Sequence, residues 1–379
     1  MFSRVGIVGI GYEGFRPVVS DLSTREMMFE ACSKAYDDAN IDPRKDVSSF
    51  ISCDEDLWEG WSITDEMVPD QMGGARRPVC TVSGDGLLGI ANAAMQISAG
   101  IGDLVVVEAH SKVADVLTKE EVERLALEPS YIRPVADADT LAALEMSYYM
   151  NGRKVERSLV DEVVAEEKRR GLRNPRASFS ARLERTEVSS SEEIVHPLKR
   201  LDKADYAEAS VAVVLASERW IKKEKKDAIF IDGIAWNSSL PWYEDVDWKS
   251  RYPEAKYLRE SFKKCCKDAG IKEDMLQFDV VEIDDQYSYK LLQHIDALLQ
   301  DGKESRNVME KLPANLNPSS GYLSLGNFVE ASSLARVLEA VLQLRGEAGK
   351  MQLKRAANAL IASWRGIPTS TGGVIILSR

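Results

Sequence analysis

The sequence predicts an α/β protein whose second half repeats its first. Short apolar runs alternate with longer segments of helical periodicity, a pattern typical of layered folds with largely parallel strands. The predicted strands are apolar at nearly every position, as in sheets that are covered on both faces. A helix–strand segment that starts at Glu30 also resembles a segment that starts at Glu260. Together these three observations predict two α/β halves with a common pattern.

The first half shows this alternation element by element. Ser23 is placed to cap an amphipathic helix, and a later helix consists mostly of small residues. In chain order we expect a strand at Val5–Ile10, a helix at Thr24–Ala39, a strand at Val47–Ser52, a helix at Gly86–Ala99 and a strand at Leu104–Glu108. A polar, mostly helical stretch then separates this half from the second.

The internal repeat has a constant offset of 230 residues. Ala39 corresponds to Ala269, and the next residues, Asn40 and Gly270, correspond to each other. Asparagine and glycine most readily take the left-handed conformation at a helix end. The offset therefore predicts two equivalent helices that end in the same way, with chance similarity between two amphipathic helices as the alternative.

Composition and charge narrow the classes of function. The 379 residues include 49 Lys+Arg and 61 Asp+Glu, a formal net charge of −12, which argues against a broad nucleic-acid-binding face. No apolar run approaches the ~20 residues of a membrane span. The five cysteines form no CxxC pair, so we expect neither a disulfide framework nor a metal site. We expect a cytoplasmic protein that binds neither nucleic acid nor a membrane.

A basic run stands out against this acidic background. Residues 168–185 include seven basic residues and one acidic residue. One interpretation is a solvated helix face. The other is an anion-binding patch, in which Lys168, Arg170 and Arg173 contact phosphate groups of a ligand.

Residues 9–14, with the sequence GIGYEG, fit the dinucleotide-binding pattern G-x-G-x-x-G directly after a strand. A dinucleotide site also needs these glycines to open a helix, whose N-terminus holds the pyrophosphate. Here Phe15, Arg16 and Pro17 follow, and the next helix is expected only at Thr24. We therefore interpret the match as accidental.

The Gly-rich turn around Ser83 comes directly before the small-residue helix. The N-terminus of a helix favours negative charge, as at an oxyanion site or beside an acyl-transfer nucleophile. Ser83 is therefore a candidate nucleophile. The alternative is that it only caps the helix, as serine commonly does.

Four segments together resemble the thiolase superfamily, most closely its sterol-carrier-protein-type and archaeal branch. They are VGIVGIGYEGF, RNPRASFSARL, HPLKRLDKADYAEASVAVVLASE, and NPSSG with LQLRGEAG. This resemblance runs end to end. It implies a duplicated five-layer α-β-α-β-α fold with an inserted loop domain, in which the helices that begin near Ser83 and Asn327 are buried between the sheets. Residues 1–117 and 201–222 would form the first half, 118–200 the loop domain and 223–379 the second half.

The chain departs from the resembled family at its catalytic positions. Ser83 stands at the position of the nucleophilic cysteine, and Asn327, which follows Gly326, replaces a histidine. Asp284 replaces a second histidine and could act as a base only if desolvation raised its pKa toward neutrality. Cys80 fits as the nucleophile only if the helix register shifts by three residues. Gly366 lies in the turn that matches part of the family's acyl site.

Two functions follow from the resemblance. In the first, the chain binds CoA or acyl-CoA, needs no other cofactor, and lacks the usual Cys–His Claisen chemistry. In the second, it is an active acyltransferase with a site rebuilt around Ser83, Asp284 and Asn327. The resemblance also implies a homodimer or tetramer, paired through the edge strand at Val79–Val82, and allows a small zinc-ribbon and OB-fold partner protein.

Overall fold

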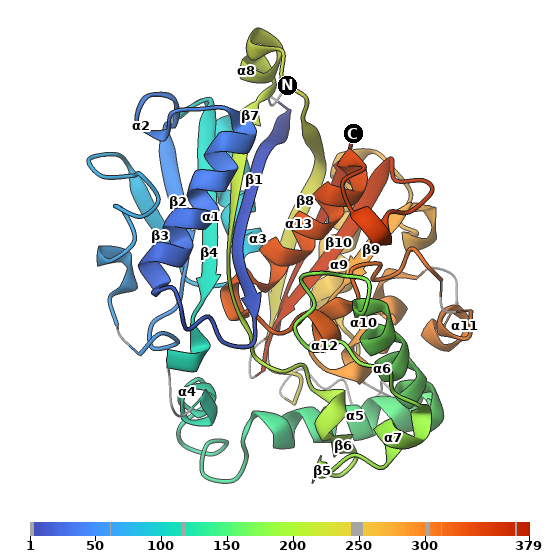
Figure 1. Cartoon of the computed structure of the whole chain (residues 1–379). Helices are drawn as coiled ribbons and strands as arrows, with labels where there is room; N and C mark the ends of the chain where they lie inside the picture. Colours follow the sequence, from blue (N-terminus) through green and yellow to red (C-terminus); the bar gives the residue numbers. More distant parts are fainter. Residues whose placement is uncertain are drawn as a thin grey trace.

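The computed structural model describes residues 4–60, 62–115, 119–243, 253–299, 304–311, 313–367 and 370–379. Within these residues, nine strands form one hydrogen-bonded sheet in the order β3-β2-β4-β7-β1-β8-β11-β10-β9 (Figure 1). The strands are β1 (Val5–Arg16), β2 (Ser49–Cys53), β3 (Val79–Val82), β4 (Leu104–Ser111), β7 (Glu208–Ser217), β8 (Ile229–Ser239), β9 (Val280–Ile283), β10 (Asn358–Arg365) and β11 (Ser370–Ser378).

The strand order repeats about the β1–β8 pair, so the predicted duplication is confirmed. The order β2-β4-β7-β1 on one side corresponds to β9-β10-β11-β8 on the other. Helices α1 (Thr24–Ala39) and α9 (Lys256–Ala269) occupy equivalent places. Each ends in a left-handed residue, Asn40 with φ 50° and Gly270 with φ 69°.

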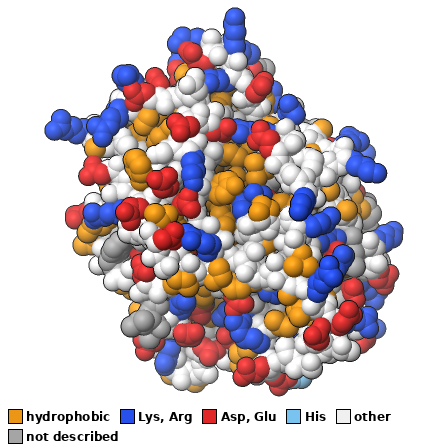
Figure 2. Space-filling model, in the orientation of Figure 1, with side chains coloured by type: hydrophobic (Ala, Val, Ile, Leu, Met, Phe, Trp, Pro, Cys, Tyr) orange, Lys and Arg blue, Asp and Glu red, His pale blue; other side chains and the backbone are white. Residues whose placement is uncertain are grey.

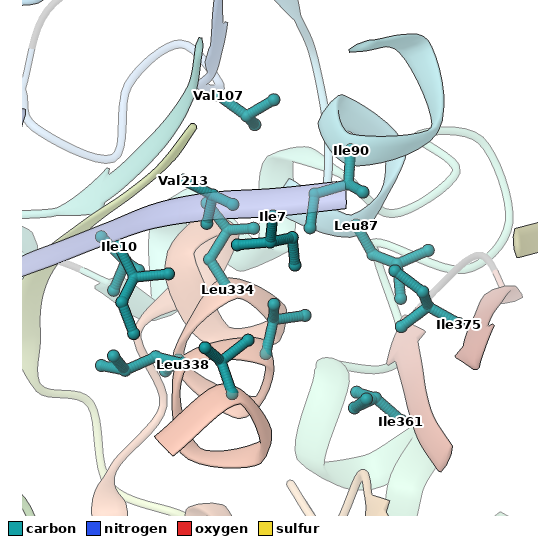
Figure 3. Packing of buried hydrophobic residues seen from close by; sticks show 14 of the residues in the cluster. Ile7, Ile10, Leu87, Ile90, Val107, Val213, Leu334, Leu338, Ile361 and Ile375 are labelled. Atoms are coloured by element: carbon teal, nitrogen blue, oxygen red, sulfur yellow. The ribbon is translucent and has the colours of Figure 1, made fainter. Parts of the chain in front are cut away.

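Helices α3 (Gly86–Ser98) and α13 (Ser332–Arg345) form the middle layer of the fold. Their side chains join strands of both halves in one hydrophobic core, with Leu87 of α3 and Leu334 of α13 among them (Figure 3). Gly86 lets the helices touch, because a Cβ there would lie 2.5 Å from Leu334 Cγ. Small residues in and next to the two helices are all buried: Ala91, Ala93, Ala94, Ala331, Ser332, Ser333 and Ala335.

Two further hydrophobic clusters cover the outer faces and complete the five predicted layers. One joins α1 to β1, β4 and β7 of the first half. The other joins α9 and α10 (Ser288–Leu298) to β9, β10 and β11 of the second half. The layered α/β class implied by the resemblance is therefore confirmed.

The glycines of the dinucleotide-like pattern have a packing role. They lie inside β1, which continues to Arg16, beyond the strand end expected at Ile10. A Cβ at Gly9 would lie 2.5 Å from the carbonyl oxygen of Ala35, so the glycine lets α1 pack closely on the strand. No helix begins at this pattern within the described residues, and the interpretation of the match as accidental agrees with this geometry.

The segment between β4 and β7 covers one end of the two halves (Figure 1). It contains α4 (Lys119–Leu125), α5 (Ala138–Arg153), α6 (Arg157–Gly171), α7 (Arg185–Ser189), β5 (Glu193–Val195) and β6 (Leu198–Lys199). Helices α5 and α6 pack against α10, and α6 also packs against α12 (Gly321–Leu325). The predicted boundary at residues 117 and 118 lies outside the described residues, and the division into three parts stays a prediction.

Three short helices complete the described fold: α2 (Pro43–Asp46), α8 (Glu218–Glu224) and α11 (Ser305–Met309). None of the described helices is both long enough and apolar enough to cross a membrane. On the face drawn in Figure 2, acidic and basic side chains are mixed, and hydrophobic side chains gather between the two halves. This face has no broad basic area of the kind that nucleic acid requires.

Candidate active site

A cavity of about 320 Å³ opens where β2, β9 and β10 end. Both halves of the fold and helix α4 contribute to its wall. The lining residues are Glu55, Asp56, Leu57, Trp58, Asp85, Val122, Glu123, Leu125, Ala126, Tyr206, Asp284, Gln286, Tyr322, Asn327, Val329, Ser332, Trp364, Arg365, Gly366 and Ile367. Clefts at the carboxyl ends of strands in α/β folds are common ligand sites.

Asp284, the residue directly after β9, lines this cavity. Its backbone N–H donates to the carbonyl oxygen of Ala362, and its Oδ1 accepts a hydrogen bond of 3.0 Å from the N–H of Gln286. Burial raises the pKa of the Asp284 carboxyl to about 7, although the nearby Arg336 guanidinium acts in the opposite direction. The condition under which this aspartate could act as a base near neutral pH is therefore met.

Asp85 is a second carboxyl group in the same cavity. It caps the N-terminus of α3, where its Oδ1 accepts a hydrogen bond of 3.1 Å from the N–H of Leu87 and another from the Ser333 hydroxyl. Burial raises the pKa of Asp85 to about 6. Its negative charge in turn helps to raise the pKa of Asp284, so the two carboxyl groups titrate near each other and near neutrality.

Tyr322 supplies a hydroxyl group without a partner. The hydroxyl oxygen is buried and makes no hydrogen bond to any described residue. Burial raises the pKa of Tyr322 well above its ordinary value, so the group stays protonated and can donate. The ring packs 3.7 Å from the guanidinium carbon of Arg336, a fully buried cation that also pairs with Asp285.

Asn327 presents a hydrogen-bond donor to the cavity. Its side-chain oxygen accepts from the N–H of Val329 at 3.0 Å and from the Ser332 hydroxyl at 3.2 Å. Both hydrogen bonds are made by the side-chain oxygen. The amide nitrogen of Asn327 is therefore available to donate to a ligand. Asp284 and Asn327, two of the three predicted catalytic residues, thus line one cavity.

The structure does not bring Ser83, the third predicted catalytic residue, into this cavity. Ser83 is exposed and lies before α3, whereas Asp85, two residues later, holds the helix N-terminus and lines the wall. Cys80 is exposed on the edge strand β3 and does not line the cavity either. The lining residues include no cysteine and no histidine. Helix capping is performed by Asp85, which corrects the interpretation of this turn.

The predicted phosphate-binding residues lie elsewhere too. Lys168 and Arg170 are buried in α6, where Arg170 donates to Glu166 at 2.6 Å and to the carbonyl oxygen of Pro313 at 3.2 Å. The Lys168 ammonium lies 5.7 Å from the ring centre of Phe179. Arg173 is exposed, and none of the three lines the cavity. The interpretation of this run as an anion-binding patch does not hold for Lys168 and Arg170, because both side chains are enclosed by protein.

Of the two predicted glycines, only one lines the cavity. Gly366 lines the cavity, whereas Gly326 does not and instead has φ 115°, next to Ala207. Trp364 and Arg365 are both in the wall, and Arg365 forms ion pairs with Glu55 and Glu330. Tyr322 was missed by the sequence interpretation. Its place after the NPSSG motif was the available signal.

Comparison with known proteins finds similarity to thiolases. Residues 249–379 match the family described as thiolase C-terminal domain-like. Over 391 aligned residues, the chain is 22% identical to an acetyl-CoA acetyltransferase of Methanothermobacter thermautotrophicus, and the alignment covers 99% of both proteins. These similarities support a relationship to the thiolase superfamily.

Further similar proteins agree with this relationship. The chain is 28% identical to sterol carrier protein 2 of Oryctolagus cuniculus over 198 residues, which are 50% of this chain but only 36% of that protein. Its fold matches the structure titled "Ltp2-ChsH2(DUF35) aldolase" with a TM-score of 0.81 and 19% identity, covering 99% of this chain and 97% of the other. It also matches a monomeric SCP2-thiolase-like protein of Mycobacterium smegmatis, with a TM-score of 0.75, 17% identity, and coverage of 99% and 77%. These two likenesses confirm the thiolase fold.

Proposed function

We propose that this protein binds a CoA thioester and makes or breaks a carbon–carbon bond in its acyl group by proton transfer. The observation that carries the proposal is Asp284. It lines a cavity without cysteine or histidine, and burial gives its carboxyl a pKa of about 7, where an imidazole would also titrate. The site thus has an acid–base group but no sulfur nucleophile.

A retro-aldol cleavage of a 3-hydroxyacyl-CoA uses this arrangement directly. The ionised Asp284 carboxylate accepts the proton of the 3-hydroxyl group, and the bond between C2 and C3 breaks. C3 becomes the carbonyl carbon of an aldehyde or ketone, and the electron pair passes into the thioester as an enolate. The Asp284 carboxyl then returns its proton to C2. No bond to the protein forms, so no nucleophilic residue is needed.

Two donors suit the enolate oxygen that develops in this step. The Tyr322 hydroxyl and the Asn327 amide nitrogen both belong to the cavity wall and have no partner among the described residues. Arg336 lies against the Tyr322 ring and adds positive potential where negative charge develops. Fixed donors of this kind are worth about 10² to 10³ in rate at oxyanion sites.

The comparisons support both parts of this proposal. The archaeal relative is named for its action on acetyl-CoA, which supports a CoA thioester as ligand. One similar structure is titled an aldolase, which supports carbon–carbon cleavage on this fold. The alternative, an acyltransferase that uses Ser83, is weaker because Ser83 lies outside the cavity.

The proposal also covers assembly and location. Strand β3 pairs with β2 on one side only within the described residues, so its free edge could pair in a homodimer or tetramer. A small partner protein is supported by the two-component title of the aldolase structure, whereas another similar structure is titled monomeric. The five unpaired cysteines support a cytoplasmic location.

Turnover of two substrates tests the proposed chemistry. The purified protein is incubated with 3-hydroxyacyl-CoA thioesters of several chain lengths and, separately, with acetoacetyl-CoA and free CoA. We expect release of an aldehyde and acetyl-CoA from the hydroxyacyl thioesters, a loss of this activity in Asp284→Asn, and no thiolysis. Binding of CoA without either reaction would support the ligand and overturn the chemistry. Thiolysis at a rate above about 1 s⁻¹ would overturn the proposed reaction type.

A further inference from the structure

A group of three buried side chains lies beside the cavity without taking part in its wall. Asp54, Glu59 and His110 each offer one ligand atom, and these atoms all lie within 4.8 Å of one another. Strands β2 and β4 are parallel neighbours in which Cys53 lies beside Ala109. The residues that follow these two, Asp54 and His110, therefore lie beside each other. Glu59, five residues after Asp54 in the chain, lies close to both of these side chains.

The His110 ring is oriented as in many metal sites. Its Nδ1 lies 3.3 Å from the Glu108 carboxylate, while its Nε2 faces Asp54 Oδ1 at 3.9 Å. Glu108 is itself held by a hydrogen bond of 2.7 Å from the Ser210 hydroxyl. A carboxylate that accepts from one ring nitrogen of histidine leaves the other nitrogen free to bind a metal and fixes its direction.

Two oxygen atoms in this group have no hydrogen-bond partner among the described residues. They are Asp54 Oδ2 and Glu59 Oε2, in side chains of residues that are only 3% and 6% exposed. The other Glu59 oxygen accepts from the N–H of Lys112 at 3.2 Å. Buried acceptors without partners cost free energy, and two carboxylates at this separation repel each other unless positive charge lies between them.

We propose that Asp54, Glu59 and His110 bind one divalent transition-metal ion, with Glu108 orienting the histidine. One imidazole nitrogen and two carboxylate oxygens suit Zn²⁺, Mn²⁺, Fe²⁺ or Co²⁺ better than Ca²⁺ or Mg²⁺, which prefer oxygen ligands alone. Ligand atoms of one such ion are separated by about 3 to 4.2 Å, since each bond is about 2.1 Å long. A small contraction of the group therefore suffices, and water would complete the coordination.

The proposed ion has a structural consequence for the cavity. Asp56, Leu57 and Trp58, which lie between the ligands Asp54 and Glu59 in sequence, are all part of the cavity wall. A bound ion would tie both ends of this segment to β4 through His110. Metal binding is therefore expected to protect residues 55–58 from proteolysis and hydrogen exchange, whether or not the proposed reaction occurs.

Metal titration of the full chain tests the site. After treatment with a chelator and its removal, the protein is titrated with Zn²⁺, Mn²⁺ and Co²⁺ by calorimetry, and the Co²⁺ complex is followed by visible absorption. We expect one ion per chain and a Co²⁺ spectrum with a nitrogen ligand. Asp54→Asn is expected to weaken binding by more than about 100-fold, and Glu108→Gln by about 10- to 100-fold because it acts through His110.

Two control variants separate this site from other groups. His196→Gln removes an exposed histidine that lies 3.0 Å from Glu193, and Asp284→Asn removes a buried carboxyl of the cavity. Both are expected to bind the ion as the unmodified protein does. If Asp54→Asn does not fold, Glu108→Gln decides the question. No binding at millimolar metal, or equal binding in the Glu108→Gln and unmodified proteins, would overturn the proposal. His110 would then only form ion pairs with the neighbouring carboxylates.

Discussion

Ser333 of α13 donates a hydrogen bond to the Asp85 carboxylate at the start of α3, so a residue of the second half completes the helix cap of the first. The same hydroxyl oxygen accepts a hydrogen bond of 2.8 Å from the N–H of Leu87. Both partners are buried at the contact between the two central helices. Asp85, which lines the cavity, is thus held in position by a contact between the two halves of the fold.

Replacing Ser333 by alanine tests this relationship. The Ser333→Ala variant leaves a buried carboxylate and a buried N–H with one fewer partner each. We expect a loss of about 1 to 3 kcal/mol in the free energy of unfolding, measured by urea titration. Ser190→Ala, at an exposed position, is the control and should stay within about 0.5 kcal/mol. Equal stability of the two variants would show that this hydrogen bond contributes little.

Much of the fold was predictable because it depends on regular patterns. The apolar runs and the repeat offset of 230 residues indicated both halves, and the resemblance to thiolases implied which two helices are buried. The end of β1 was less predictable. Its last residues include Glu13 and Arg16, which are polar, and the strand continues because β7 pairs with it as far as Arg16.

The candidate site was only partly predictable. Asp284 and Asn327 were found because family motifs give their positions, and these motifs follow the chain register. Ser83 was misplaced because the register of a turn does not determine which side chain faces the cavity. Arg170 is buried where it donates hydrogen bonds to the carbonyl oxygens of Pro313 and Leu316, far away in sequence, so no local charge pattern could show its burial.

The contribution of Asp284 to the free energy of unfolding is expected to fall between about pH 4 and pH 7. Burial raises the folded-state pKa of Asp284 to about 7, whereas an aspartate in the unfolded chain has its ordinary value near 4. In this range the folded state holds a proton that the unfolded chain releases, so raising the pH favours unfolding.

The Asp284→Asn variant removes this pH dependence. Relative to the unmodified protein, we expect its free energy of unfolding to increase by about 2 to 4 kcal/mol between pH 5 and pH 8, because the unmodified carboxylate becomes charged while it stays buried. Urea titrations at the two pH values measure the difference. Asp232→Asn, at a surface ion pair with Arg4, is the control. A constant difference between Asp284→Asn and the unmodified protein at both pH values would contradict the raised pKa.

Ser83 and Asn327 are expected to differ sharply in their effect on the proposed activity. Ser83→Ala should leave turnover within about twofold, because the side chain is exposed outside the cavity. Asn327→Ala removes a donor from the cavity wall and should lower kcat by about 10² to 10³. Ser83→Cys should not create thiolysis activity, since the new thiol would also lie outside. A large loss in Ser83→Ala, measured with the hydroxyacyl thioesters, would restore the nucleophile hypothesis.

The pH dependence of kcat/KM tests directly whether the carboxyl groups of Asp284 and Asp85 influence each other. If ionised Asp284 is the base, kcat/KM should rise with pH and level off above its apparent pKa of about 7. The charge of Asp85 contributes to that raised value, so Asp85→Asn should move the midpoint to lower pH. Asparagine can still accept from Leu87 and Ser333, which preserves the helix cap. Asp232→Asn should leave the midpoint unchanged. A profile that is flat between pH 5 and pH 9, or a midpoint that Asp85→Asn does not move, would assign the base to another group.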